Sequence, residues 1–216
     1  MGLPFEHAAS FAPADFVRDG SNALALTWLD DPARWPDRRL ALWGGRGCGK
    51  THLLHLWADR VGAVMIDGGA LPDLASGFTA LALDNADTAP EQALLHTLNQ
   101  AVAGAIHVVL AAREAPARWP VRLPDLASRL RATTAVQIEP AEDSLLRTLL
   151  ARQLSDRQLA VPAALRDWLL RRLPRTPAAI REIAARLDRA QLEQGTGVTR
   201  ALLTELMVGL EESGTG

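Results

Sequence analysis

Tyrosine is absent from this chain, and cysteine and lysine occur only once each among its 216 residues. The single cysteine, Cys48, excludes an internal disulfide and a cysteine-rich metal site. No apolar run approaches the roughly 18 residues of a membrane-spanning helix, and residues 1–20 lack the charged-then-apolar pattern of a signal peptide. We therefore expect a cytoplasmic protein that does not bind a membrane.

An excess of positive charge is also missing. The chain has 23 Lys and Arg against 25 Asp and Glu, a net charge of −2. A nucleic-acid contact would therefore need a local basic patch, and we expect no direct sequence-specific DNA binding. The length and the 48% hydrophobic content suffice for one full core and a small second one.

The position of the only lysine is informative. Arginine supplies the other 22 of the 23 basic residues, yet lysine stands where a flexible point charge must reach a β- or γ-phosphate. It belongs to a phosphate-loop pattern, G-x-x-x-x-G-K-[ST], whose residues are Gly44, Gly45, Arg46, Gly47, Cys48, Gly49, Lys50 and Thr51. Backbone N–H groups of such a loop cradle phosphates, and Thr51 offers its hydroxyl to Mg²⁺. The sequence therefore predicts binding of ADP or ATP with Mg²⁺.

The surroundings of the loop support this prediction. An apolar stretch of strand length, Arg39–Trp43, precedes it, and Leu53, Leu56 and Trp57 follow at helical spacing. The loop thus lies where a strand ends and a helix begins, and the positive end of that helix points at the phosphates.

Further apolar runs alternate with helical patterns and predict the fold. The runs cover residues 63–66, 80–83, 106–111 and 134–138. Strands of this kind, without polar alternation, indicate a parallel sheet covered on both faces. We expect an α/β protein with a five-stranded parallel αβα core that binds its ligand at the carboxyl ends of the strands.

After Pro140 the strand signals stop and four amphipathic helical patterns follow. We therefore predict an all-α lid domain at residues 140–216, a nucleotide-binding core at 13–139 and an extended segment at 1–12. A separate helical bundle argues against a small-molecule P-loop kinase, which would need an acceptor pocket and a mobile lid inside the core.

A second nucleotide element is predicted at residues 81–84, an apolar strand that ends in Asp84, an acid suited to the Mg²⁺ shell. Many ATPases have a water-activating acid at the next position, but here it is Asn85, which cannot accept a proton. Asp87 is either a substitute for that acid or a solvated loop carboxylate. We expect weak hydrolysis by this chain alone.

Two arginines and one histidine complete the set of candidates. Arg129 precedes the last predicted strand, and Arg181 lies beside the apolar stripe of a lid helix; position alone leaves each either functional or an ordinary surface residue. We include His52, directly after the loop, among the nucleotide-binding residues. His52 and His55 have no third ligand at metal spacing, which favours packing or surface roles over a metal site.

These features together resemble the AAA+ ATPase family and, within it, the branch of the replication initiator DnaA. The resemblance covers nearly the whole chain, in segments 16–25, 44–51, 81–84, 126–130 and 180–187. It implies that Val17 and Asn22 belong to the entry of the adenine pocket. It also implies that Arg129 is an arginine finger and Arg181 the lid sensor.

Within that branch the chain is most similar to the Hda family of regulatory inactivators of DnaA, including the HdaA-like proteins of alphaproteobacteria. That family lacks the DNA-binding domain of DnaA and docks on the DNA sliding clamp, the β subunit of DNA polymerase III, through an N-terminal peptide. Only Leu3, Pro4 and Phe5 match that peptide, and its glutamine is absent. Either the peptide begins upstream or clamp binding is weaker here.

The resemblance implies a nucleotide-bound regulator of replication initiation that promotes hydrolysis of DnaA-bound ATP together with the clamp. The alternative is a self-sufficient AAA+ ATPase that loads or remodels another replication protein. Asn85, and Ala112-Arg113 in place of the polar Ser-Asp pair of the DnaA branch, speak against that alternative. Whether ADP or ATP is the active form, and whether the chain forms homo-oligomers, stays open.

Overall fold

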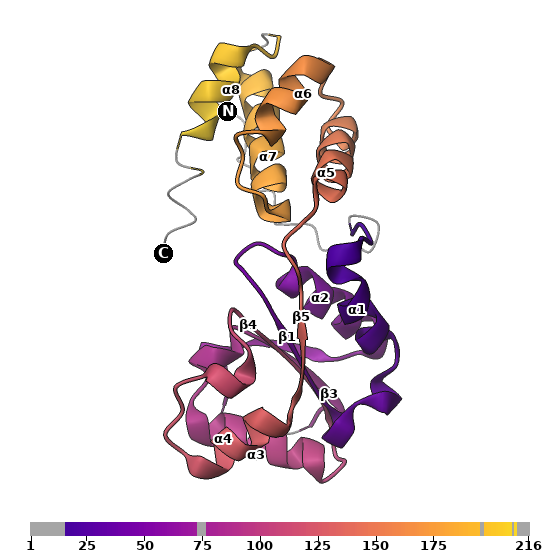
Figure 1. Ribbon diagram of the computed structural model, residues 1–216, viewed down its shortest axis with the longest axis vertical. Coiled ribbons are helices and arrows are strands. Elements are labelled where there is room, and N and C mark those ends of the chain that lie inside the picture. The colour runs from indigo at the N-terminus through magenta and orange to yellow at the C-terminus, as the bar shows by residue number, and fades with distance from the viewer. Residues whose placement is uncertain (1–15, 73–76, 195–196, 209, 211–216) are drawn as a thin grey trace. The chain divides into compact units, whose positions relative to one another are not determined.

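A computed structural model describes residues 16–72, 77–194, 197–208 and 210 (Figure 1). The strands are β1 Arg39–Trp43, β2 Val64–Asp67, β3 Ala80–Asp84, β4 His107–Ala112 and β5 Thr134–Gln137. The α-helices are α1 Gly20–Asp30, α2 Lys50–Val61, α3 Glu91–Val102, α4 Pro124–Ala132, α5 Asp143–Asp156, α6 Ala163–Leu170, α7 Pro177–Gln194 and α8 Arg200–Met207.

The five strands form one parallel sheet in the order β2-β3-β4-β1-β5. Strand β4 is central, and β1 pairs with β4 on one side and with β5 on the other. This confirms the predicted α/β class with a five-stranded parallel core. The predicted strand bounds are off by one residue at several ends. The shift matters at β2, because the strand continues to Asp67 and not only to residue 66.

Alternation of side chains along the strands produces two cores. Leu81, Leu83, Val108 and Leu110 belong to a buried cluster that includes residues of α3 and α4. The residues between them in sequence, such as Val109, face the opposite side, where α2 packs on β3 and β4. Helices therefore cover both faces of the sheet, with α1 and α2 on one and α3 and α4 on the other (Figure 1).

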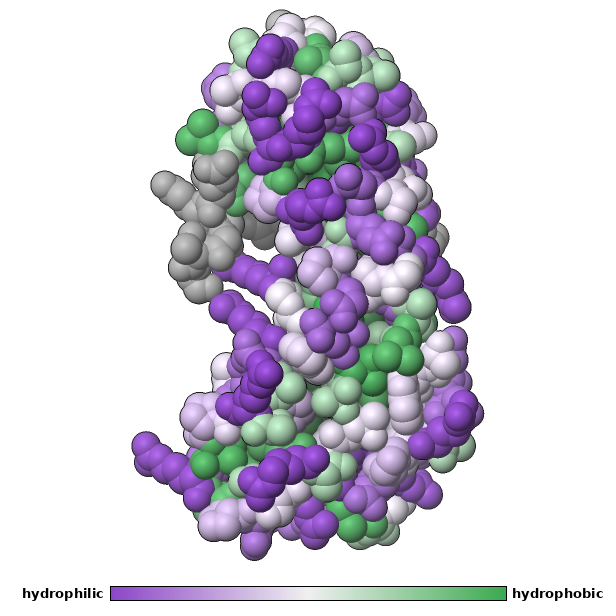
Figure 2. Space-filling model, viewed as in Figure 1, coloured by the Kyte–Doolittle hydropathy of each residue, from purple (hydrophilic) through white to green (hydrophobic). Residues whose placement is uncertain are grey.

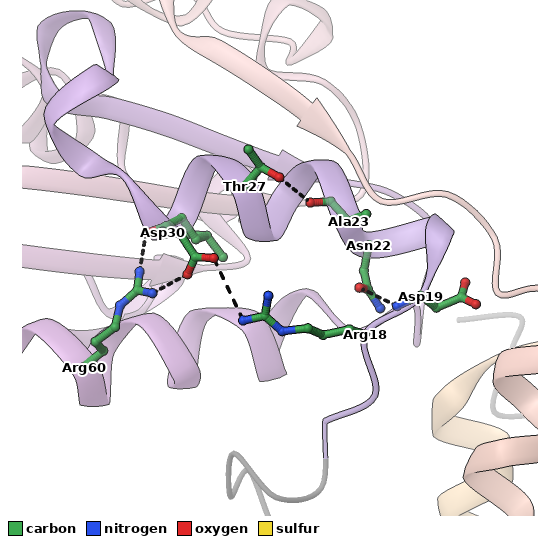
Figure 3. A network of polar contacts seen from close by, with 8 residues as sticks. Arg18, Asp19, Asn22, Ala23, Thr27, Asp30 and Arg60 are labelled. Carbon is green, nitrogen blue, oxygen red and sulfur yellow. Dashed lines mark hydrogen bonds and ion pairs between the residues drawn. The ribbon is translucent and has the colours of Figure 1, made fainter.

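Helix α1 begins at Gly20 and has a side-chain cap. Asp19 is the N-cap, and its side chain accepts a hydrogen bond from the Ser21 N–H at 3.0 Å. Asn22 completes a capping box by accepting from the Asp19 N–H at 3.1 Å. Asp30, the last residue of α1, receives ion pairs from Arg18 and Arg60, which joins α1 to α2 (Figure 3).

The described residues divide into two compact units. One contains residues 16–45 and 49–139, and the other contains 46–48 and the described residues from 140 onward. In the second unit α5 packs on α7, and α7 packs on α8. Arg186 of α7 donates to the carbonyl oxygens of Leu206 and Val208, each at 2.9 Å, so that it caps the end of α8.

Hydrophilic residues are spread over the visible surface of both units (Figure 2). In the described part of the chain, no helix combines the length and the apolar composition that are needed to cross a bilayer.

Candidate functional site

The phosphate-loop sequence connects the carboxyl end of β1 to the amino end of α2. Gly49 is the N-cap of α2 and has φ 110°, a left-handed conformation that favours glycine. A cap without a side chain leaves the first-turn N–H groups of α2 accessible to an anion. This local backbone fits the predicted phosphate loop.

Lys50 extends back over this loop. Its ammonium donates to the carbonyl oxygens of Gly44 at 2.8 Å and Gly45 at 2.9 Å. These contacts hold the single lysine of the chain at the mouth of the loop, where its charge can meet a phosphate.

Thr51 and Asp84 are brought together as the sequence suggests. The Thr51 hydroxyl donates to Asp84 Oδ2 at 2.6 Å, and Asp84 Oδ1 accepts from the Asn85 N–H at 3.0 Å. Mg²⁺ prefers oxygen ligands and commonly uses one or two protein ligands together with substrate phosphates. A hydroxyl and a carboxylate in contact beside the loop fit a nucleotide-bound Mg²⁺. Within the described residues, no group of three His, Cys, Asp or Glu could hold a metal alone.

Asp67 is a site residue that the sequence analysis missed. It is the register partner of Asp84 on the neighbouring strand, and its Oδ2 accepts from Asn85 Nδ2 at 2.6 Å. Its Oδ1 accepts from the Gly69 N–H at 3.1 Å. The only available signal was the acid directly after the apolar run 63–66. The position expected to carry a catalytic acid thus carries an amide that is bonded to an acid on the next strand.

The backbone at this pair is closely packed. Asn85 adopts a left-handed conformation at φ 48° and ψ 42°. A Cβ at Gly68 would lie only 2.2 Å from the Asn85 carbonyl oxygen, so a residue without a side chain is needed there. Asp87, the other candidate acid, is exposed.

Two of the residues assigned to the adenine-pocket entry are in contact. Asn22 is buried, and its Nδ2 donates to the Val17 carbonyl oxygen at 3.0 Å. The Asn22 side chain thus holds the Val17 backbone as well as capping α1. His52 is also buried, and its ring meets the ring of Phe16 edge-on at a centroid distance of 5.2 Å. This packing favours a structural contribution from His52.

Several other candidates lie in the second unit or outside the described residues. Arg46, Gly47 and Cys48 are grouped with the second unit. Arg181 lies in the second turn of α7, half-buried and next to the fully buried Ile180. Leu3, Pro4 and Phe5 fall outside the described residues.

Arg129, on α4, is held at both its backbone and its side chain. Its carbonyl oxygen accepts from Thr133 Oγ1 at 2.9 Å and from Arg39 Nη1 at 3.3 Å. Its Nε donates to Asn99 Oδ1, on α3, at 3.1 Å. Arg39 and Asn99 are further residues that sequence reasoning did not single out.

Arg39 is unusual because its guanidinium is completely buried. It forms an ion pair with Asp37 at 2.5 Å. Burial lowers the pKa of Arg39 from its ordinary value, the Asp37 carboxylate opposes this shift, and the charge of Arg129 adds to it. A guanidinium remains charged in proteins, so a fixed positive charge lies beneath the backbone of Arg129.

The phosphate-loop residues and Arg129 lie at opposite edges of the sheet. The loop lies at the carboxyl ends of the strands, and Arg129 is anchored at the amino end of β1. Arg39, which contacts Arg129, begins β1, whereas Gly44 follows the end of β1 and Asp84 ends β3. At about 3.3 Å per residue, the backbone from Arg39 to Gly44 spans about 16 Å. Arg129 is therefore anchored at the edge of the sheet remote from the phosphate loop of its own chain.

Comparison with known proteins identifies the fold. No protein-family model matches the chain. Domain III of the replication initiation protein DnaA from Thermotoga maritima is similar with a TM-score of 0.75 and 18% identity, over 97% of this chain and 99% of that domain. AMPPCP-bound DnaA from Aquifex aeolicus is similar with a TM-score of 0.67 and 18% identity, over 92% of this chain and 70% of that one.

A mutant of Thermotoga maritima RuvB is also similar, with a TM-score of 0.62 and 17% identity, over 87% of this chain and 67% of that one. The chain therefore has the AAA+ fold that DnaA and RuvB share, with C-terminal helices after the α/β core.

Proposed function

We propose that this chain binds ADP or ATP with Mg²⁺ and promotes hydrolysis of the ATP bound to DnaA, together with the DNA sliding clamp. It would thereby act as a negative regulator of replication initiation. The observation that carries this proposal is the separation of the phosphate loop from Arg129. The chain has one edge suited to holding its own nucleotide and another that presents an arginine to a nucleotide held elsewhere.

The nucleotide-binding half of the proposal rests on Lys50, Thr51 and Asp84. The lysine lies over the loop carbonyls, and the hydroxyl and carboxylate meet at 2.6 Å. Lys50 would neutralise phosphate charge, and Thr51 and Asp84 would hold Mg²⁺, which neutralises the charge shared by the β- and γ-phosphates when bound. DnaA from Aquifex aeolicus, which shares the fold, binds the ATP analogue AMPPCP.

Weak hydrolysis by the chain itself follows from Asn85. Its amide nitrogen donates to Asp67, and an amide cannot take a proton from water. Ala112, at the end of β4, also offers no polar side chain to the nucleotide edge. Bound nucleotide would therefore persist and act as a structural ligand.

The in-trans half rests on Arg129. A guanidinium placed against a transferring phosphoryl group stabilises the charge that develops on its oxygens, an effect worth about 10³–10⁵ in rate where an arginine finger has been measured. Arg129 is half-buried, yet its side chain contacts a neutral amide and not a carboxylate. Its charge therefore remains available to an anionic partner.

The other candidates receive supporting roles. Val17, Asn22 and His52 would shape the adenine end of the nucleotide site. Arg181 would sense the nucleotide from the lid, so that the core at 13–139 and the lid at 140–216 respond to it. Leu3, Pro4 and Phe5 within residues 1–12 would contact the β subunit of DNA polymerase III.

The test is a reconstitution with DnaA and the sliding clamp from the same organism. DnaA is loaded with radiolabelled ATP, and hydrolysis is followed with and without this chain and with and without clamp on DNA. We expect acceleration only when all components are present. Substantial turnover by this chain alone, abolished by Lys50→Ala, would instead identify a self-sufficient ATPase.

A further inference from the structure

We propose that Asn99 is a positioning residue for Arg129. By accepting a hydrogen bond from Nε, it turns the distal edge of the guanidinium, Nη1 and Nη2, towards the phosphate of a nucleotide on a partner molecule. This inference rests on the proposed function of Arg129 as an arginine finger.

The chemistry of the contact fixes the orientation of the Asn99 amide. A guanidinium donates hydrogen bonds and accepts none, so the group of Asn99 that faces it must be the oxygen. Nε and Oδ1 are 3.1 Å apart, which is a normal hydrogen-bond length. The contact joins α3 to α4, two helices that pack on each other.

The backbone of Arg129 is fixed independently. Its carbonyl oxygen accepts from Thr133 at 2.9 Å and from the buried Arg39 at 3.3 Å. Asp37 holds Arg39 in turn. With the backbone anchored by two donors, the contact with Asn99 determines where the remaining length of the side chain points.

The contact occupies Nε and leaves the other end of the guanidinium unoccupied by acids. Among the residues that the structure describes, none forms a salt bridge with Arg129, although Asp125 lies one turn earlier on α4. Asp125, Asn99 and Arg129 line the same depression of about 220 Å³. The neutral amide of Asn99 orients the guanidinium and leaves its charge intact. A carboxylate at that position would neutralise the charge.

The distal edge of a guanidinium matches two phosphate oxygens in a bidentate arrangement. Stabilisation of a phosphoryl group depends strongly on position, and a misplacement of about 1 Å can cost 10²-fold in rate. Loss of Asn99 should therefore lower the catalytic effect of Arg129 without removing its charge and without changing how tightly the chain binds DnaA.

Three variants test this inference in the reconstituted DnaA reaction: Asn99→Ala, Gln92→Ala and Arg129→Ala. Gln92 is the matched control, because it is an exposed amide on the same face of α3, two turns before Asn99. Each variant is titrated, and the maximal rate is separated from the concentration of chain that gives half of it.

We expect Asn99→Ala to lower the maximal rate about tenfold, with a half-maximal concentration within about twofold of the parent value. Gln92→Ala should behave as the parent, and Arg129→Ala should lose the stimulation. If Asn99→Ala matches Gln92→Ala while Arg129→Ala is inactive, Asn99 is not a positioning residue. If Arg129→Ala keeps full stimulation, the proposed function itself is wrong.

A second readout does not depend on DnaA. The Arg129 Nε–H resonance, identified in NMR spectra by its absence from Arg129→Lys, should exchange slowly with solvent in the parent and fast in Asn99→Ala. Equal exchange in the two proteins would contradict the inference even if activity fell.

Discussion

The Thr51 hydroxyl donates a 2.6 Å hydrogen bond to Asp84, which ties the first turn of α2 to the carboxyl end of β3. This contact lies at the edge of the sheet where we propose that Mg²⁺ binds. Thr51→Val keeps the shape of the side chain but removes the oxygen. We expect Mg²⁺ to strengthen ADP and ATP binding to the parent, and this gain to fall about tenfold in the variant.

The measurement is nucleotide affinity with Mg²⁺ and with a chelator. Thr27→Val is the matched control, because Thr27 is exposed on α1 and donates only to the Ala23 carbonyl of its own helix (Figure 3). An undiminished effect of Mg²⁺ in Thr51→Val would remove Thr51 from the metal site.

Exchange of Asp67 and Asn85 should raise the rate of ATP hydrolysis by this chain. The double variant Asp67→Asn, Asn85→Asp exchanges the two side chains. An amide and a carboxylate can still form a hydrogen bond, but the carboxylate now follows Asp84 directly, where it can accept a proton from water. Because a positioned general base commonly contributes 10²–10⁴-fold, we expect intrinsic ATP hydrolysis to rise at least about tenfold.

Asp87→Asn should leave the slow intrinsic rate unchanged, because Asp87 is an exposed loop carboxylate. The rate is read in single-turnover assays without DnaA, alongside nucleotide affinity. A double variant that binds ATP as tightly as the parent and hydrolyses it no faster would show that Asn85 does not limit hydrolysis.

Gly68 predicts a stability effect at the same place. In Gly68→Ala the new methyl group would meet the Asn85 carbonyl oxygen, so Asn85 or β2 must shift. Overpacking of this kind costs about 1–3 kcal/mol of unfolding free energy. Gly69→Ala is the control, since its Cβ would meet neighbours no closer than 3.5 Å. Denaturant unfolding compares the two variants, and equal midpoints would contradict the close approach of Gly68 to the Asn85 carbonyl oxygen.

Glu91 predicts a pH dependence of stability. Its carboxylate accepts from the backbone N–H groups of Arg122 and Leu123, and these hydrogen bonds lower its pKa. A pKa that is lower in the folded than in the unfolded state adds stability above the unfolded pKa, and this stability is lost as pH falls through the folded pKa. Glu91→Gln should therefore lower Tm near pH 7 and have little effect well below the ordinary Glu pKa of about 4.3.

Thermal unfolding between pH 7 and pH 3 measures this difference. Because the Glu91 contacts join the start of α3 to the chain entering α4, they also support the helices that carry Asn99 and Arg129. A Tm difference between parent and variant that does not shrink at low pH would contradict the assignment to the ionised carboxylate.

The sequence predicts the sheet well because apolar runs without polar alternation are typical of buried parallel strands. The loop between β1 and α2 could also be predicted, because its glycines, Lys50 and Thr51 are adjacent in the chain. Phosphate binding by this loop stays a prediction. The end of β2 was placed one residue short because Asp67 is polar, and the apolar pattern alone does not extend to it.

The missed residues act through contacts between distant parts of the chain. Asp67 and Asn85 are 18 residues apart, Asn99 and Arg129 are 30 apart, and Arg39 and Arg129 are 90 apart. Arginine is usually exposed, so nothing local marks Arg39 as fully buried. These pairings depend on strand order and helix packing. No pattern within a single segment indicates them.

The central claim is that Arg129 acts on the ATP of another molecule, and exchange of one arginine tests it most directly. Arg129→Ala is compared with Arg131→Ala, which removes the same charge from the same helix at an exposed position. With labelled ATP on DnaA and clamp loaded on DNA, we predict that Arg131→Ala accelerates hydrolysis as the parent does and that Arg129→Ala does not. Equal acceleration by the two variants would contradict the account.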